Sequence, residues 1–309
     1  MKKTISVLSL TLGLLMTIGF ISCGGSDSEK GENSEEQVVY DSGDFDFSAK
    51  NSDGVTLYYN YINAEEVEVT YAYSTNYDGY YGGYGYEKVK KIRIPSTVTT
   101  NGRTLKVTRI GKNAFSIESG GAMESITIPN SITSMGAGAL GSTEKIIVSD
   151  IGAWCKIKFE SAPLYMVGGG RHIYSNDNSE ITNLVIPSGV TSISDSAFEG
   201  CESITAISLP ATLESIGENA FMNCQITSIT IPNSIKEIGK GALNTPTLTT
   251  AVISLMEEPF YFSSYFDYIF SDKTHKNATL YVPVGTLSKY KETNGWNSFL
   301  FIKEGTGAN

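Results

Sequence analysis

The chain has 309 residues and a formal net charge of −10, with 33 acidic and 23 basic residues. This excess of acids repels nucleic-acid phosphates and anionic lipid headgroups, so nucleic acid is excluded as a partner. The length would fit two ordinary globular domains, but that expectation gives way when a sequence contains internal repeats.

The N-terminal residues have the layout of a secretory signal. Lys2 and Lys3 precede an apolar run ending at Phe20, which is too short to span a bilayer comfortably. The segment Ile21-Ser22-Cys23 resembles the lipobox of bacterial lipoproteins, in which the cysteine is acylated. We therefore expect a signal peptide over 1–22 and a lipid on Cys23; a signal peptide with a chance cysteine is the alternative. Cleavage leaves 21 basic and 33 acidic residues, a net charge of −12.

A polar segment follows and is expected to form a flexible acidic tether over 23–45. Its first half has no apolar side chain that could offset the entropy lost on ordering. An acidic stretch after the lipid-bearing cysteine is also similar to the surface-export signal of Bacteroidota lipoproteins. The predicted location is a lipid anchor in the outer membrane with the chain exposed at the cell surface, and an orientation toward the periplasm stays open.

Residues 46–91 are predicted to form a small β cap, because Val55 to Tyr59 and Val67 to Tyr73 alternate as strands do. The cap contains a run of tyrosines and glycines, a composition typical of binding loops. The alternative is a loop tip or a cap packed on itself. The tyrosines predicted to contact a partner are Tyr77, Tyr80, Tyr81, Tyr84 and Tyr86.

An internal repeat dominates the rest of the chain. Segments starting at Ile181, Ile204 and Ile226 align with shifts of 23 and 22 residues. The aligned positions include Leu184, Ile207 and Ile229; Pro187, Pro210 and Pro232; and Phe198, Phe221 and Leu243. The template also occurs over 126–140 and, interrupted, over 92–115. A period of this length is one coil of a solenoid, which cannot bury its apolar row without a neighbouring coil.

Each I-x-I step has strand periodicity, so its middle residue is expected to face solvent. These residues are Arg93, Thr127, Val185, Ser208 and Thr230. Of them, Thr127, Ser208 and Thr230 are predicted to contact a partner on the solenoid face. The following proline should end each strand because it cannot donate a ladder hydrogen bond. The glycines after the second isoleucine are expected in turns with positive φ: Gly111, Gly136, Gly217 and Gly239.

The repeated pattern I-x-I-P-x-x-V-x-x-I-G-x-x-A-F-x-x-C resembles the BspA-like, Treponema-type leucine-rich-repeat family of bacterial surface antigens. The resemblance covers nearly everything from Lys50 to Lys303. It implies a right-handed, horseshoe-type leucine-rich-repeat solenoid, mainly β with a parallel sheet, and adhesion to host proteins, cells or other bacteria. The expected solenoid spans 92–303, with an insert at about 146–180, an aromatic C-terminal cap at about 252–303 and a tail over 304–309. The aromatic run from Phe260 to Phe270, which includes Tyr268, is expected in the core of this cap.

Several features suggest chemistry but have simpler interpretations. Gly136 to Gly141 spells G-x-G-x-x-G, yet it lies in a coil turn without the helix of a dinucleotide site, so no cofactor is expected. His172 and His275 have no triad or metal-site spacing around them. Cys155 lies with His172 in the insert, where a structural role is expected for both.

Cys201 and Cys224 occupy the same position in neighbouring coils. We expect them to be free thiols that pack as small hydrophobic groups, and a disulfide is the alternative.

These observations predict a noncatalytic recognition or adhesion protein without cofactor or metal. Its expected partner is a protein of the host matrix, a host cell or another bacterium, and the membrane is contacted only through the lipid. A surface glycan-binding protein is the alternative, because exposed tyrosines can stack on sugar rings. An enzyme of unknown class is a distant third possibility.

Overall fold

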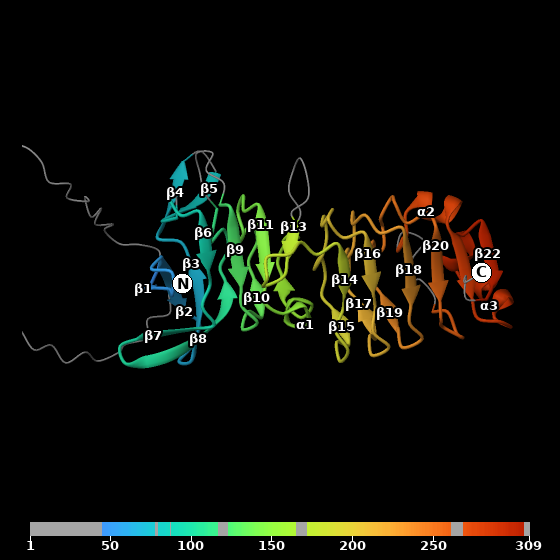
Figure 1. Cartoon of the computed structure of the whole chain (residues 1–309), viewed down its shortest axis with the longest axis horizontal. Helices are drawn as coiled ribbons and strands as arrows, with labels where there is room; N and C mark the ends of the chain where they lie inside the picture. The colour runs from blue at the N-terminus through green and yellow to red at the C-terminus, as the bar shows by residue number, and fades with distance from the viewer. Residues whose placement is uncertain are drawn as a thin grey trace, which may run out of the picture. The chain divides into compact units, whose positions relative to one another are not determined.

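The computed structural model describes residues 45–77, 80–86, 88–116, 123–164, 172–260 and 268–305, all within the compact unit Tyr40–Asn309. The side chains of residues 73–84 are outside this description, as are Cys23 and nearly all of the predicted tether. Within the unit, coils of parallel β-structure stack in chain order (Figure 1). The solenoid predicted from the repeat is confirmed.

The first ladder of strands contains the I-x-I steps. Its strands are β6 (Lys91–Arg93), β9 (Ser125–Ile128), β11 (Lys145–Val148), β13 (His172–Tyr174), β14 (Asn183–Val185), β16 (Ala206–Ser208), β18 (Ser228–Ile231), β20 (Ala251–Ser254), β21 (Thr279–Val282) and β22 (Phe301–Glu304). They form parallel sheets in the orders β13-β11-β9-β6, β14-β16 and β18-β20-β21-β22. No strand continues through the proline of its coil, as predicted.

Most coils also contribute a second strand, which lies further along the chain than the first, and these strands form a second parallel ladder. The repeat pattern did not predict this ladder. Its strands are β8 (Arg103–Ile110), β10 (Ser134–Met135), β12 (Lys158–Phe159), β15 (Ser192–Ile193), β17 (Ser215–Ile216) and β19 (Glu237–Ile238). They pair in the orders β8-β10-β12 and β15-β17-β19. Most have only two residues, too few to show strand periodicity in a sequence.

The N-terminal cap joins this second ladder. Its strands are β1 (Phe47–Lys50), β2 (Thr56–Tyr61) and β3 (Glu66–Thr70), in an antiparallel meander. Strand β3 pairs in parallel with β8, while β7 (Thr97–Thr100) pairs with β8 antiparallel. The cap therefore covers the edge of the second ladder that the first coil would otherwise expose, while β6 is the end strand of the first ladder. A separate hairpin consists of β4 (Tyr73–Tyr77) and β5 (Tyr80–Tyr84).

Inward side chains of successive coils form columns in register. Ile126 and Ile146 are strand partners, as are Leu184 and Ile207, and the column side chains of β14, β18, β20 and β21 are fully or almost fully buried. On the far side of the coil, the rings of Phe198 and Phe221 stack with centroids 5.4 Å apart. Each coil thus supplies the apolar cover that its neighbour lacks.

The core continues across the insert. Strand β11 was expected at the start of the insert but is an ordinary rung between β9 and β13. The helix α1 (Ile151–Trp154) follows, capped by Asp150, whose carboxylate accepts from the Ala153 amide at 2.8 Å. The buried Trp154 indole donates to the Ala197 carbonyl at 2.9 Å. This bond ties the insert to the coil that follows it.

The C-terminal segment contains α2 (Asp272–Asn277), α3 (Leu287–Glu292) and the short 3-10 helix η1 (Trp296–Ser298). Strands β20, β21 and β22 continue the first ladder, so the expected aromatic cap is built around ordinary rungs. Phe270 packs against Trp296 and Phe299 in the core, as predicted. Tyr268 was expected in the core but is 53% exposed. Residues 261–267 of the same aromatic run lie outside the described part of the chain.

The glycines that follow the second ladder are not in turns of positive φ, so that expectation is wrong. A Cβ on Gly217 would lie 2.5 Å from the Asp195 amide nitrogen, and one on Gly239 would lie 2.5 Å from the Glu218 amide nitrogen. The coils are too close there for any side chain. Positive φ occurs two residues later instead, at Asn219 and Gly241.

A test of this packing is Gly217→Ala. The added methyl group has to push two coil backbones apart, so the free energy of unfolding should fall by about 1–3 kcal/mol, as for other overpacked sites. Ser194 is the matched control, since it holds the same coil position beside the insert and already carries a Cβ. Ser194→Ala should change the free energy by less than about 0.5 kcal/mol in the same thermal or denaturant unfolding measurement. Equal effects of the two variants would refute the close-contact explanation.

Candidate partner-binding surfaces

The outer face of the first ladder displays the side chains that alternate with the buried column. In β14, Asn183 and Val185 are exposed on either side of the buried Leu184. In β16 and β18, Ser208 and Thr230 are exposed as predicted. Thr127 is different: it is only 9% exposed, because all four residues of β9 are buried. Two of the three predicted contact residues on this face are therefore accessible to a partner.

The part of this face from β14 to β21 has no charge. The chain segments that carry it are 181–193, 203–213, 225–235, 245–256 and 278–287, and none contains Asp, Glu, Lys, Arg or His. Every charged residue between 181 and 287 lies outside these segments of the sequence. We call the outward residues of β14, β16, β18, β20 and β21 the neutral face: Asn183, Val185, Ala206, Ser208, Ser228, Thr230, Ala251, Ile253, Thr279 and Tyr281.

The preceding coils present a charged surface instead. On β6, Lys91 lies 3.8 Å from Glu124 and Arg93 lies 3.7 Å from Asp53. The Lys145 ammonium lies 4.3 Å from the centre of the Tyr174 ring, and His172 pairs with Glu180. The ion pairs among them are largely exposed, so each contributes little to stability. Along one ladder the surface therefore changes from charged to neutral at the insert.

The tyrosine-rich run forms the β4–β5 hairpin, with Tyr73 opposite Tyr84 and Tyr77 opposite Tyr80. The side chains of Tyr77, Tyr80, Tyr81 and Tyr84 lie outside the described residues, so their predicted contacts are untested. Tyr86 is only 2% exposed, and its hydroxyl donates to the Thr70 carbonyl at 2.7 Å. It packs against Tyr58 and Phe115. The expectation that Tyr86 contacts a partner is corrected, since it is part of the cap core.

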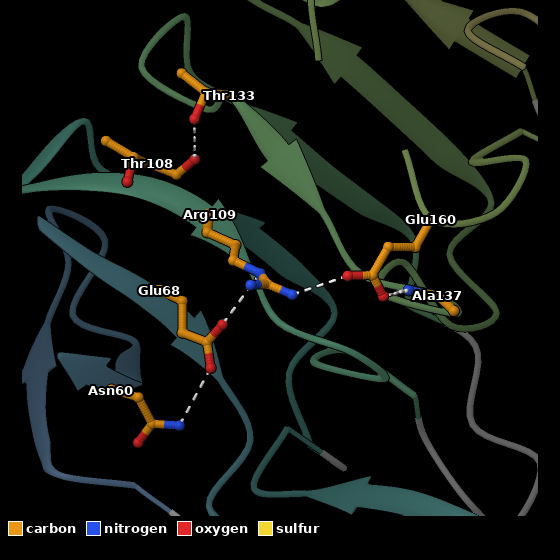
Figure 2. A network of polar contacts seen from close by, with 7 residues as sticks. All are labelled: Asn60, Glu68, Thr108, Arg109, Thr133, Ala137 and Glu160. Carbon is orange, nitrogen blue, oxygen red and sulfur yellow. Dashed lines mark hydrogen bonds and ion pairs between the residues drawn. The ribbon is translucent and has the colours of Figure 1, made fainter. Parts of the chain in front are cut away.

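Figure 2 shows a polar network on the second ladder, centred on Arg109 of β8. Its Nε lies 3.4 Å from Glu68 Oε2 on β3, and its Nη2 lies 2.9 Å from Glu160 Oε1 beyond β12. The other Glu160 oxygen accepts from the Ala137 amide at 3.2 Å. Asn60 of β2 donates to Glu68 at 3.3 Å. Because these carboxylates are already paired, the network holds the cap and the first coils in register and is not a ligand site.

Two of the hollows lined by described residues lie beside the second ladder and beside α1, and neither has a catalytic arrangement. A groove of about 600 Å³ beside β15, β17 and β19 is lined by residues that include Asp195, Glu218, Lys236 and Phe260. Two of its polar groups serve the fold: Lys236 pairs with Glu214 at 2.9 Å, and Asp195 accepts from the Glu218 amide at 2.7 Å. A second hollow of about 470 Å³ lies beside α1.

The residues considered for nucleophilic chemistry lie in unsuitable environments. Cys155 is fully buried, and desolvation raises its pKa to about 12, which disfavours the reactive thiolate. The His172 imidazole is half exposed and pairs with Glu180. Cys201 and Cys224 are free and buried, as the packing interpretation predicts. Within the described ranges, no three His, Cys, Asp or Glu side chains gather in a way that could hold a metal ion.

His275 of α2 packs edge-on against Phe270 and Phe299. Its Nε2 is buried and makes no hydrogen bond to the described residues. Burial lowers its pKa, and the nearby Asp272 carboxylate opposes this by raising it. Protonation would place a charge among aromatic rings, so this histidine is part of the C-terminal packing.

None of the described helices is long and apolar enough to cross a bilayer.

Comparisons with known proteins point to one repeat family. Residues 84–158 and 170–290 match the family described as "BspA type Leucine rich repeat region (6 copies)". No curated protein matches the chain.

Several solved structures are similar to this one at low sequence identity. A leucine-rich cell surface protein from Faecalibacterium prausnitzii is 18% identical, with 84% of this chain and 73% of that chain covered and a TM-score of 0.46. A leucine-rich repeat protein from T. pallidum is 17% identical, with coverage of 77% and 84% and a TM-score of 0.29. The pneumococcal vaccine antigen PcpA is 12% identical, with coverage of 85% and 99% and a TM-score of 0.30.

The environment of His275 predicts a pH effect on stability. Because the pKa is lower in the folded state, the unfolded chain binds this proton first as the pH falls. The contribution of neutral His275 to the free energy of unfolding is therefore fully present above the ordinary histidine pKa of about 6.5. This contribution is lost as the pH falls from there toward the lowered pKa of the folded state. His275→Leu should flatten this part of the unfolding free energy against pH, whereas Asp272→Asn should steepen it. An unchanged profile in both variants would show that His275 is not the titrating group.

Proposed function

The chain belongs to the BspA-type leucine-rich repeat family, and we propose that it is a noncatalytic recognition or adhesion protein of the bacterial cell surface. In this proposal it binds proteins of a host or of other bacteria through the outer face of the first ladder. The observation that carries the proposal is the neutral face, a regular and accessible surface formed by five strands.

Chemistry and shape support binding over catalysis. Interface centres are depleted of charged residues and enriched in aromatic and apolar ones. The neutral face is uncharged and includes Val185, which is 57% exposed, together with Ile253 and Tyr281. An enzyme would need titratable groups converging in a hollow, and in the groove beside β19 the Lys236 and Asp195 side chains are already engaged with the fold.

The nature of similar proteins supports a surface location. The F. prausnitzii protein is described as a cell surface protein, and the pneumococcal one as a vaccine antigen. In this chain the proposed anchor is a lipid on Cys23 in the outer membrane, followed by the acidic tether. The proposal places the solenoid outside the cell, where a host or bacterial protein can reach it.

The anchor can be tested with Cys23→Ser. Without the acylated thiol the protein should move from the membrane fraction to the soluble fraction, because no other hydrophobic anchor is proposed. Wild-type protein on intact cells should be removed by an added protease that does not enter the periplasm. A wild-type protein that resists this protease until the outer membrane is broken would overturn the surface location but not the fold.

Partner binding can be tested with two surface variants of equal charge. Immobilised extracellular-matrix proteins and a neutral glycan array would be probed with the wild type, with Ser208→Arg/Thr230→Arg on the neutral face, and with Thr97→Arg/Ser192→Arg elsewhere. We expect binding to a matrix protein that falls at least tenfold in the neutral-face variant only, since buried unpaired charges cost several kcal/mol. A third variant, Tyr80→Ser/Tyr81→Ser/Tyr84→Ser, tests the hairpin.

Binding to glycans alone would favour the glycan-binding alternative, in which hydroxyl-rich rows and exposed tyrosines hold sugar rings. Equal binding by both arginine variants would remove the neutral face from the proposal. Equal binding by the tyrosine variant would remove the hairpin.

A further inference from the structure

We propose that the neutral face binds a second copy of this chain, so that two solenoids pack face to face with their coils running in opposite directions. This inference rests on the proposed function, because it names one protein partner of the same face. It follows from the distribution of charge, the sizes of the side chains and the area of the face.

The charge distribution selects this face for self-association. With a net charge of −12 after cleavage, two copies repel each other when charged surfaces approach. The neutral face is the region where five successive rungs carry no ionisable side chain other than the Tyr281 phenol. A pair of such faces can approach without burying an unpaired charge, which would otherwise cost several kcal/mol.

Side-chain size changes along the face in a complementary way. The rungs β14, β16 and β18 present mainly small groups, such as Ala206 and Ser208. The rungs β20 and β21 present the larger Ile253 and Tyr281, which are strand partners on neighbouring rungs. Figure 1 shows these strands in the order β14, β16, β18, β20.

A two-fold axis parallel to the strands and centred over β18 matches these sizes. It lays β14 over β21 of the second copy, β16 over β20, and β18 over itself. Ile253 of one copy then lies over the small Ser208 of the other, while Tyr281 lies over Val185. Sheets that pack face to face need this kind of interdigitation to fill the space of about 10 Å between them.

The area is suited to a weak, reversible dimer. Five rungs about 4.8 Å apart, each with three or four residues at about 3.3 Å, give a face of roughly 300 Å² per copy. The pair then covers about 600 Å², below the size of a stable specific interface, so a single pair of faces binds weakly. Many copies anchored on facing cells would add such weak contacts together. The opposite coil directions place the two N-terminal caps at opposite ends of the pair, an arrangement that suits anchors in facing membranes.

Sedimentation velocity of residues 24–309, which contain the whole compact unit, tests the proposal over concentrations from micromolar up to about 1 mM, because the interface is small. The wild type should shift from the monomer to the dimer sedimentation coefficient, and raising the salt concentration should not weaken the dimer because no ion pair holds it. Ser208→Arg/Thr230→Arg should remain monomeric. Thr230 of one copy lies over Thr230 of the second copy near the axis, so two arginines would be brought together there. Thr97→Arg/Ser192→Arg should dimerise like the wild type. Thermal unfolding would show that both variants are folded.

A wild type that stays monomeric throughout, or a dimer that survives in the neutral-face variant, would overturn the self-association. A dimer that dissociates at high salt would also contradict it, because ion pairs would then hold the interface. If the monomeric wild type still binds a matrix protein through Ser208 and Thr230, the proposed function stands without this inference.

Discussion

Each coil is stable only while another coil covers its inward side chains and pairs with its strands. A coil has about 22 residues and no interior of its own, so its apolar groups must form columns shared with its neighbours. The ladder spacing that brings these columns together also brings backbones together. At Gly217 and Gly239 this spacing excludes even a methyl group. The same contact thus explains both the hydrophobic repeat and the repeated glycine.

Inward stacking leaves the outward half of each coil free to vary. In the N-terminal coils this freedom is used for paired charges, such as the Arg109 network that joins the cap to the first rungs. After the insert the charges move to the second half of each coil, and the first ladder is neutral from β14 to β21, whereas β22 carries Lys303 and Glu304. A fold of this kind provides area to a partner. Recognition therefore depends on which rows of side chains are displayed, and their neutrality is the feature that the functional proposals use.

Most of the fold could be predicted from the sequence, because the same stacking contacts recur in every coil. The I-x-I steps, the strand-ending prolines and the exposed Ser208 and Thr230 all follow from a period that alignment of the chain with itself reveals. Features that occur once, or that depend on three-dimensional neighbours, were not accessible in this way. Tyr86 lies in a run of tyrosines, yet its hydroxyl bonds to Thr70 in the cap core. Thr127 has the sequence of an exposed position, but its strand is buried on all four residues.

The glycine positions show the same limit. The glycine after isoleucine was predicted to allow a positive φ. The structure shows instead that glycine is needed there because the backbone of the neighbouring coil leaves no room for a side chain. Two-residue strands such as β17 carry no periodicity of their own, so the second ladder became visible only in three dimensions. The charge-free segments, by contrast, could have been read from the sequence by aligning charges as well as apolar residues across the repeats.

The register of the coils can be measured directly by cysteine cross-linking across the outer face. Val185 and Ser208 are partners in neighbouring rungs, whereas Val185 and Thr230 are two rungs apart. Neighbouring rungs place Cα atoms about 4.8 Å apart, within the range that a disulfide spans, and two rungs exceed it. Val185→Cys/Ser208→Cys should therefore oxidise to an intramolecular disulfide, and Val185→Cys/Thr230→Cys should not. Equal oxidation of the two pairs, or oxidation of the second alone, would contradict the stacking on which the whole account depends.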